Sequence, residues 1–103
     1  MDKSMKVNKK LNGSELLMEI EGGIDSTTAP ELNDILAASI NGITSLILDF
    51  KNVDYISSAG LRVLLVNYKA MTGKGEMIIR NVNGNVMDIF TMTGFVNILT
   101  IEN

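Results

Sequence analysis

The chain contains neither cysteine nor histidine among its 103 residues. Without cysteine it has no disulfide, no thiolate nucleophile and no thiolate metal ligand. Without histidine it lacks the usual general base and the commonest protein ligand for metal ions. Any chemistry of its own must therefore use hydroxyl groups, carboxylates, amines or the backbone.

Clustered positive charge and long apolar runs are also missing. Nine basic and twelve acidic residues give a formal net charge of −3, and the basic residues are scattered along the chain. Proteins that bind nucleic acid instead gather Lys and Arg into a patch or stripe. No apolar run approaches the roughly 20 residues that span a bilayer, and the N-terminal stretch MDKSMKVNKK has no apolar signal-peptide core. We therefore expect a cytoplasmic protein that binds neither nucleic acid nor membrane.

The composition that remains is typical of a globular protein. Apolar residues make up 46% of the chain and charged residues 20%. A chain of this length fits one domain, which we expect to cover residues 1–103. Extended runs at residues 5–11 and 15–20 flank Asn12-Gly13, and both residues of this pair tolerate the positive φ of a tight hairpin turn. The chain is therefore expected to open with an antiparallel hairpin.

After the hairpin, segments with helical spacing of apolar residues alternate with short apolar runs. Ser26, Thr27 or Thr28 is expected to cap the first helix, and Asn41-Gly42 to end it. Strands joined by helices of this length are usually parallel neighbours with right-handed crossovers. The sequence therefore predicts an α/β fold with a mixed sheet, in which further strands lie at residues 45–50, 76–82 and 97–102, and further helices begin at Ala59 and span residues 83–94.

The stretch DYISSAGLRVLL, residues 54–65, passes from a strand through two serines into a helix. Serine is a favoured N-cap, so Ser57 or Ser58 is expected to cap this helix. One of them could also accept a phosphate, because Ala59 and Gly60 are small and the N-terminus of a helix favours negative charge. A phosphate would add about −1.5 to −2 charges at this point, enough to make or abolish a complex. The two interpretations are compatible.

Other polar residues are better explained by structure than by chemistry. Asp25, Asp49 and Asp54 follow or end predicted strands and could hold Mg²⁺ or accept a phosphoryl group, as in a response-regulator receiver. Receivers are built from successive parallel strands, whereas this chain opens with a hairpin and has too few strand-helix units. We expect Asp25 and Asp54 to be solvated turn carboxylates or to form Asx-turns, and we expect no metal site.

Glycines and methionines also have structural explanations. Gly73-Lys74-Gly75 follows a helix, whereas a phosphate-binding loop must precede one, so a nucleotide-hydrolysing enzyme is poorly supported. Met77, Met87 and Met92 lie among apolar neighbours, and we expect them to fill the core.

Three stretches, in order, resemble the motifs of one family. They are GGIDSTTAPEL (residues 22–32), VDYISSAGLRVLL (residues 53–65) and IFTMTGF (residues 89–95). The second is similar to the signature of the bacterial anti-sigma factor antagonists, small STAS-domain proteins in which a serine lies two residues before a glycine at a strand-to-helix junction. The resemblance covers essentially the whole chain and implies a single-domain STAS fold.

The resemblance also implies a function. In this family the unphosphorylated protein binds an anti-sigma factor that is also a serine kinase, which frees the sigma factor. Phosphorylation of the junction serine breaks the complex, and a metal-dependent serine phosphatase restores it. The chain would thus be a partner-switching regulator, not an enzyme, with no cofactor. Aligned on Gly60, its phosphate acceptor is Ser58, with Ser57 as the alternative.

The residues around the acceptor differ in part from the family pattern. Relatives often carry Asp before the acceptor and Ser or Thr after it, where this chain has Ser57 and Ala59. Arg62 lies four residues beyond Ser58 and could stabilise a phosphate there, by a few tenths of a kcal/mol for an ordinary exposed pair. The resemblance places the acidic residue Asp25 on the kinase-facing surface. The expected partner-binding residues are Asp25, Ser57, Ser58, Ala59, Gly60 and Arg62.

A second function is compatible with the same resemblance. The chain could be the STAS subunit of a bacterial lipid-transport ABC complex, in which this loop docks on an ATPase without being phosphorylated. A serine kinase or a transporter ATPase as the bound partner would distinguish the two.

Overall fold

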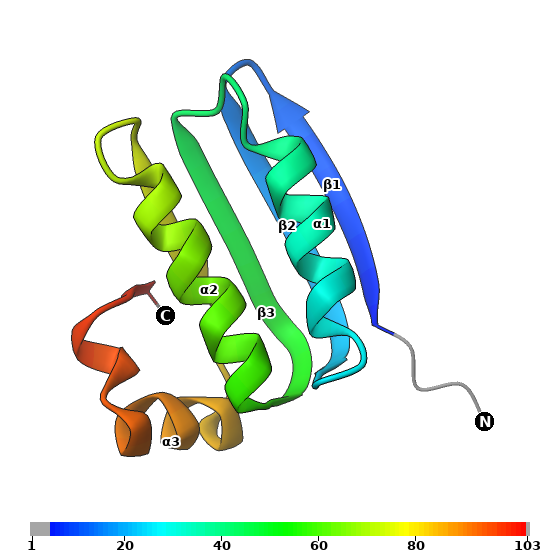
Figure 1. Ribbon diagram of the computed structural model, residues 1–103, viewed down its shortest axis with the longest axis vertical. Coiled ribbons are helices and arrows are strands. Elements are labelled where there is room, and N and C mark those ends of the chain that lie inside the picture. Colours follow the sequence, from blue (N-terminus) through cyan, green and yellow to red (C-terminus); the bar gives the residue numbers. More distant parts are fainter. Residues whose placement is uncertain (1–4, 103) are drawn as a thin grey trace.

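A computed structural model describes residues 5–102; residues 1–4 and 103 of the expected domain lie outside this range. The described elements follow the expected order (Figure 1). They are β1 (Lys6–Asn12), β2 (Glu15–Ile24), α1 (Ala29–Ser39), β3 (Ser45–Ile56), α2 (Ser58–Met71), β4 (Glu76–Arg80), α3 (Gly84–Thr93), the 3-10 helix η1 (Phe95–Asn97) and β5 (Thr100–Glu102).

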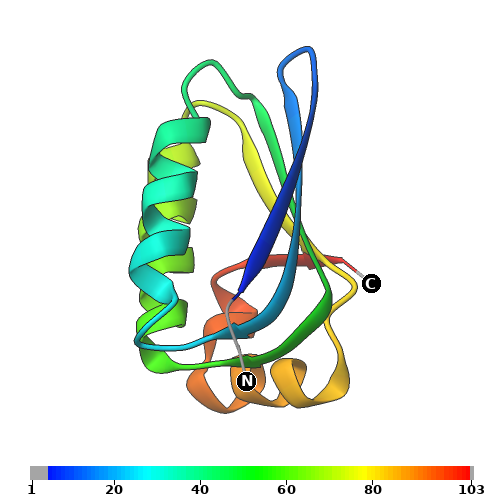
Figure 2. The same cartoon turned by 90° about the vertical axis from the view of Figure 1, so that its right-hand side faces the viewer.

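The five strands form one mixed sheet in the order β1-β2-β3-β4-β5. β1 pairs antiparallel with β2, and every other neighbouring pair is parallel. This confirms the predicted α/β fold with a sheet opened by a hairpin. Right-handed crossovers between neighbouring strands put successive helices on the same face, and α1 and α2 do lie side by side over one face of the sheet (Figure 2). α3 lies at the end of the sheet where the parallel strands finish.

The core lies between the sheet and this helix pair. Alternate residues of the central strands point toward the helices and are buried, because successive side chains of a strand point to opposite faces. The buried side chains include Leu16, Met18 and Ile20 of β2, Leu46, Leu48 and Phe50 of β3, Leu32 and Leu36 of α1, and Leu64 of α2.

One buried amide joins the two helices. Asn67 of α2 is buried, and its side-chain Nδ2 donates to the Asn33 side chain of α1 at 3.1 Å and to the Val63 carbonyl at 2.8 Å. A polar group in this position is stable because its donors are satisfied. The bond between Asn67 and Asn33 fixes how α2 lies against α1.

The third strand is twice as long as expected. Instead of residues 45–50 it covers Ser45–Ile56, and its second half is buried only at Val53 and Ile56. The register with β2 shifts between Gly22 and Gly23 and once earlier, so the alternation of apolar and polar residues is broken. This irregular half of β3 leads directly into the serine pair.

The C-terminal part corrects a second expectation. Met77 is buried and Met87 packs against the core, but the side chain of Met92, at the end of α3, is 84% exposed. Gly94 ends α3 with a φ of 81°, η1 follows, and the last strand begins at Thr100 instead of residue 97.

Within residues 5–102, no helix is both long and apolar enough to cross a bilayer.

Candidate functional site

The loops after β2 and β3 meet at the end of the sheet where the parallel strands finish. The last residues of these strands, Ile24 and Ile56, are register partners, and the Ser57 backbone N–H donates to the Ile24 carbonyl at 2.8 Å. Each loop leads into the N-terminus of a helix, α1 or α2. Sites in α/β sheets are commonly built at the carboxyl ends of the strands. The two stretches of the sequence with the strongest motifs are therefore neighbours.

The structure gives the two serines different positions. Ser57 is the N-cap of α2: its backbone is extended and its Oγ accepts the Gly60 N–H at 3.4 Å. Ser58 is the first residue of the helix and is exposed. Its hydroxyl makes no hydrogen bond to any residue within 5–102. The cap expected at one of these serines is thus Ser57, and the Ser58 hydroxyl faces solvent.

Asp25 shapes the loop in front of α1. Its Oδ1 accepts the backbone N–H groups of Thr27 at 2.8 Å and Thr28 at 2.9 Å. These bonds, the one from Thr28 foremost, lower the pKa of the Asp25 carboxyl below its ordinary value. The bond to Thr27 confirms the expected Asx-turn at Asp25. The Asp25 carboxylate is therefore engaged in the turn that precedes α1.

The N-cap of the first helix falls on one of the three residues expected for it. Thr28 occupies the N-cap position of α1, but its side chain makes no cap bond. Its Oγ1 instead donates to the Gly23 carbonyl at 2.8 Å and accepts the Asp25 N–H at 2.9 Å. Thr28 thus ties the end of β2 to the start of α1.

The other two carboxylates, Asp49 and Asp54, both lie within β3 and have separate environments. Asp49 forms an Asx-turn by accepting the Lys51 N–H at 2.9 Å, and it also accepts from Asn81 at 3.1 Å. Asp54 is an exposed carboxylate in β3 and forms no Asx-turn: among the described residues its side chain makes no hydrogen bond. Within residues 5–102 no three acidic side chains lie together as a metal site would require.

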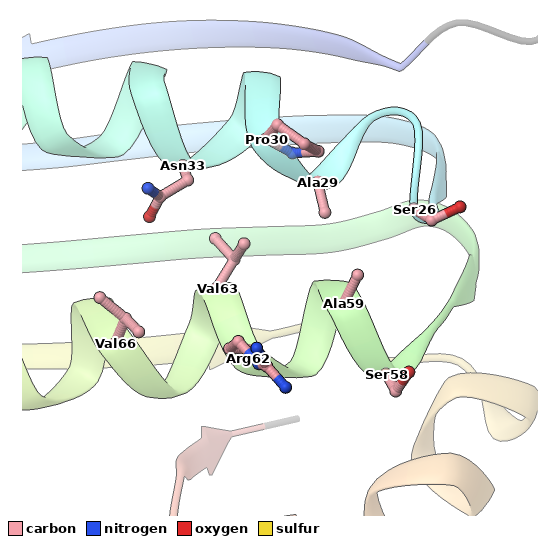
Figure 3. A pocket seen from close by; sticks show the side chains of 9 residues that line it. All are labelled: Ser26, Ala29, Pro30, Asn33, Ser58, Ala59, Arg62, Val63 and Val66. Atoms are coloured by element: carbon pink, nitrogen blue, oxygen red, sulfur yellow. The ribbon is translucent and has the colours of Figure 1, made fainter.

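A groove of about 400 Å³ lies between the N-terminal halves of α1 and α2 (Figure 3). Three of the expected partner-binding residues, Ser58, Ala59 and Arg62, line it, whereas Asp25, Ser57 and Gly60 do not. The remaining lining residues are Ser26, Ala29, Pro30, Asn33, Val63 and Val66. We refer to this feature as the α1–α2 groove.

The α1 side of the groove and its valines were not expected from the sequence. Val63 of α2 is buried, whereas Val66, one turn later, is 51% exposed. A signal was present, since Val66 follows Leu64 and Leu65 and falls outside the stripe that faces the sheet. An apolar residue on the solvent side of a helix often marks a binding surface when it lies in a groove with others.

Gly60 packs closely against the ends of β2 and β3. A Cβ at this position would lie 2.7 Å from Ile56 Cγ1 and 2.8 Å from Ile24 Cγ2. These distances are shorter than non-bonded carbon atoms tolerate, so only glycine lets α2 approach the strand ends this closely. Gly60 therefore determines how close the start of α2, with Ser58, lies to the ends of β2 and β3.

A family model and a named relative both match most of the chain. A family model described as the STAS domain matches residues 6–103. The relative named "Putative anti-sigma factor antagonist BtrV", from Bordetella bronchiseptica, is 34% identical over 96 residues, covering 91% of this chain and 82% of the relative.

Two solved structures share the fold at lower sequence identity. An anti-sigma factor antagonist from Mycobacterium paratuberculosis is similar with a TM-score of 0.88 and 19% identity, over 98% of this chain and 87% of that chain. SpoIIAA of Bacillus in its phosphorylated form is similar with a TM-score of 0.73 and 14% identity, over 95% of this chain and 92% of that chain.

Proposed function

Since the chain belongs to the STAS-domain family, we propose that it is an anti-sigma factor antagonist switched by phosphorylation of Ser58. The name of BtrV supports the first part of this proposal. The observation that carries the second is the division between the serines, in which Ser57 caps the helix while the Ser58 hydroxyl is exposed at the mouth of the α1–α2 groove. The existence of SpoIIAA in a phosphorylated form is consistent with it.

In the proposed cycle the unphosphorylated chain binds an anti-sigma factor that is also a serine kinase. The kinase transfers the γ-phosphoryl group of ATP to Ser58 Oγ, and ADP and the hydroxyl proton are released. A metal-dependent serine phosphatase then hydrolyses the ester, which restores the hydroxyl and releases inorganic phosphate. The chain is the substrate of both enzymes and contributes no catalytic group.

Charge explains why the complex would separate after the transfer. Ser58 would be buried against a kinase that holds a nucleotide, so its phosphate would face negative charge across a desolvated interface. Such like-charge contacts cost several kcal/mol, and roughly 1.4 kcal/mol is a factor of ten in affinity. The affinity would therefore fall below what the complex needs to form at its working concentrations.

The proposal predicts where the phosphate is found. After incubation with the cognate anti-sigma factor and ATP, mass spectrometry of the digested protein should find one phosphate, on Ser58. Ser57→Ala should still be modified, because it changes the cap and not the acceptor, and Ser58→Ala should not. Phosphate on Ser57 alone, or full modification of Ser58→Ala, would contradict the assignment. Capture of a transporter ATPase and no kinase would instead support the lipid-transport subunit.

A second prediction concerns the α1–α2 groove. Val66→Glu places a charge in an apolar part of the groove and should lower the affinity for the anti-sigma factor about tenfold or more. Because the Val66 side chain is already half exposed, the free energy of unfolding should hardly change. Titration calorimetry with the purified anti-sigma factor measures the first quantity, and urea denaturation the second.

Leu11→Glu is the matched control for this change. The Leu11 side chain is 66% exposed, and β1 brings it to the β1–β2 turn, at the other end of the sheet from the start of α2 (Figure 1). This variant should bind as the unchanged protein does. Equal losses for both variants would show that the groove is not the docking surface.

A further inference from the structure

Arg62 is a cation without a partner in the α1–α2 groove. It is the only charged residue among the nine that line the groove, and its side chain forms no ion pair or hydrogen bond with any other residue in the described part of the chain. The ion pairs recorded between described residues lie elsewhere, at Lys10–Glu19 and Arg80–Glu102. The α1–α2 groove therefore presents one positive charge beside apolar walls.

Arg62 and Ser58 lie on the same side of α2. Residues four apart on a helix are neighbours on its surface, and side chains lean toward the N-terminus of the helix. In Figure 3 the Arg62 side chain points along α2 toward its Ser58 end. Both residues line the same groove, so a phosphate on Ser58 and a partner's side chain would compete for the same guanidinium.

We propose that Arg62 binds a carboxylate of the anti-sigma factor while Ser58 is unphosphorylated, and that a phosphate on Ser58 takes Arg62 away from that carboxylate. This inference rests on the function proposed above and names the chemistry of the partner: an apolar side chain that enters the groove, with an acidic side chain next to it. Charge complementarity supports this choice, because an acidic group is what an unpaired guanidinium binds most strongly.

The competition favours the phosphate once it is present. It lies on the same helix as Arg62, so the two groups meet at a high effective concentration, and it carries more charge than a carboxylate. The acidic side chain of the anti-sigma factor would then face a phosphate where it had faced an arginine. Phosphorylation thus removes an attraction and adds a repulsion in one step.

Four proteins test the binding part of this inference. They carry Ser or phosphoserine at position 58, the latter installed during translation, each with Arg62 or with Arg62→Gln. With Ser58, Arg62→Gln should weaken binding to the anti-sigma factor about tenfold. The loss caused by phosphoserine should be smaller in the Arg62→Gln protein, by about threefold or more, because the attraction is already missing.

A titration without the partner tests the competing contact. ³¹P NMR should show that the second pKa of phosphoserine 58 is lower with Arg62 than with Arg62→Gln, by about 0.3 units or more. Lys69→Gln is the control, since Lys69 is an exposed cation in the last turn of the same helix and should leave this pKa unchanged.

The outcomes separate this inference from the proposed function. Three results would overturn only the role of Arg62 and leave the proposed function standing. They are equal binding by the Arg62 and Arg62→Gln proteins, additive losses in the four-protein comparison, and equal phosphate pKa values. Failure of the unmodified protein to bind the anti-sigma factor overturns the proposed function, and this inference with it.

Discussion

Ser58→Asp should weaken binding to the anti-sigma factor about 100-fold or more, whereas Ser58→Ala should bind within a few fold of the unchanged protein. Ser58 is exposed and lines the α1–α2 groove, and its hydroxyl makes no hydrogen bond within residues 5–102, so neither change removes an internal hydrogen bond. Aspartate places one negative charge where the phosphate would be, and alanine removes only the hydroxyl. Titration calorimetry with the anti-sigma factor bound to its nucleotide measures both affinities.

Ser57→Asp is the control for the position of the charge. Aspartate is as good an N-cap as serine, so this variant should keep the cap of α2. It should bind the anti-sigma factor nearly as well as the unchanged protein. If Ser57→Asp and Ser58→Asp lose the same affinity, or if Ser58→Asp loses none, negative charge at Ser58 is not the switch.

Gly60→Ala should lower the free energy of unfolding by about 1–3 kcal/mol, the usual cost of forcing an extra carbon into a packed site. The new methyl would lie 3.0 Å or less from Ile24 and Ile56, including the Ile24 backbone oxygen. Branched side chains at the ends of two strands have little room to move. The start of α2 would have to shift outward, and Ser58 with it. Urea denaturation measures the stability.

Gly84→Ala is the matched control. Gly84 also lies in the first turn of a helix, but a Cβ there would have nothing within 4 Å. Alanine favours helix more than glycine does, so this variant should be unchanged or slightly more stable. Equal stability of Gly60→Ala and Gly84→Ala would show that the close approach at Gly60 is not required.

Local signals in the sequence were sufficient for the order of the elements. The turn after β1 follows from Asn12-Gly13, although Asn12 pairs with Glu15 and the turn residues are therefore Gly13 and Ser14, one residue later than expected. Gly13 has the expected positive φ, of 65°. The alternation of helices with apolar runs gave the parallel strands, because short crossovers leave few other arrangements.

Features that depend on contacts between distant residues could not be predicted in this way. The second half of β3 was missed because the register shift against β2 breaks its pattern. Met92 was expected in the core because its neighbours are apolar, but α3 ends beside it and leaves the side chain outside. The α1 wall of the groove, with Pro30 and Asn33, exists only because α1 and α2 pack together.

For the candidate site, the sequence identified the junction but not the division of roles within it. The sequence alone does not distinguish two adjacent serines. Only the backbone geometry shows that the Ser57 hydroxyl accepts the Gly60 N–H while Ser58 is exposed. Asp25 was expected both in an Asx-turn and, by resemblance, at the partner surface. The structure shows the turn, and contact with a partner stays a prediction.

Ser57 is held on three sides, by the Ile24 carbonyl at its N–H, the Gly60 N–H at its hydroxyl and the Leu61 N–H at its carbonyl. None of these bonds uses the Ser58 hydroxyl, so a phosphate there breaks no hydrogen bond of the junction, and the contact proposed with Arg62 needs only a side-chain movement. In the proposed cycle neither modification nor its removal would wait for a slow rearrangement of the chain. The rate of the response would then depend on the amounts of the kinase and the phosphatase and on their catalytic rates.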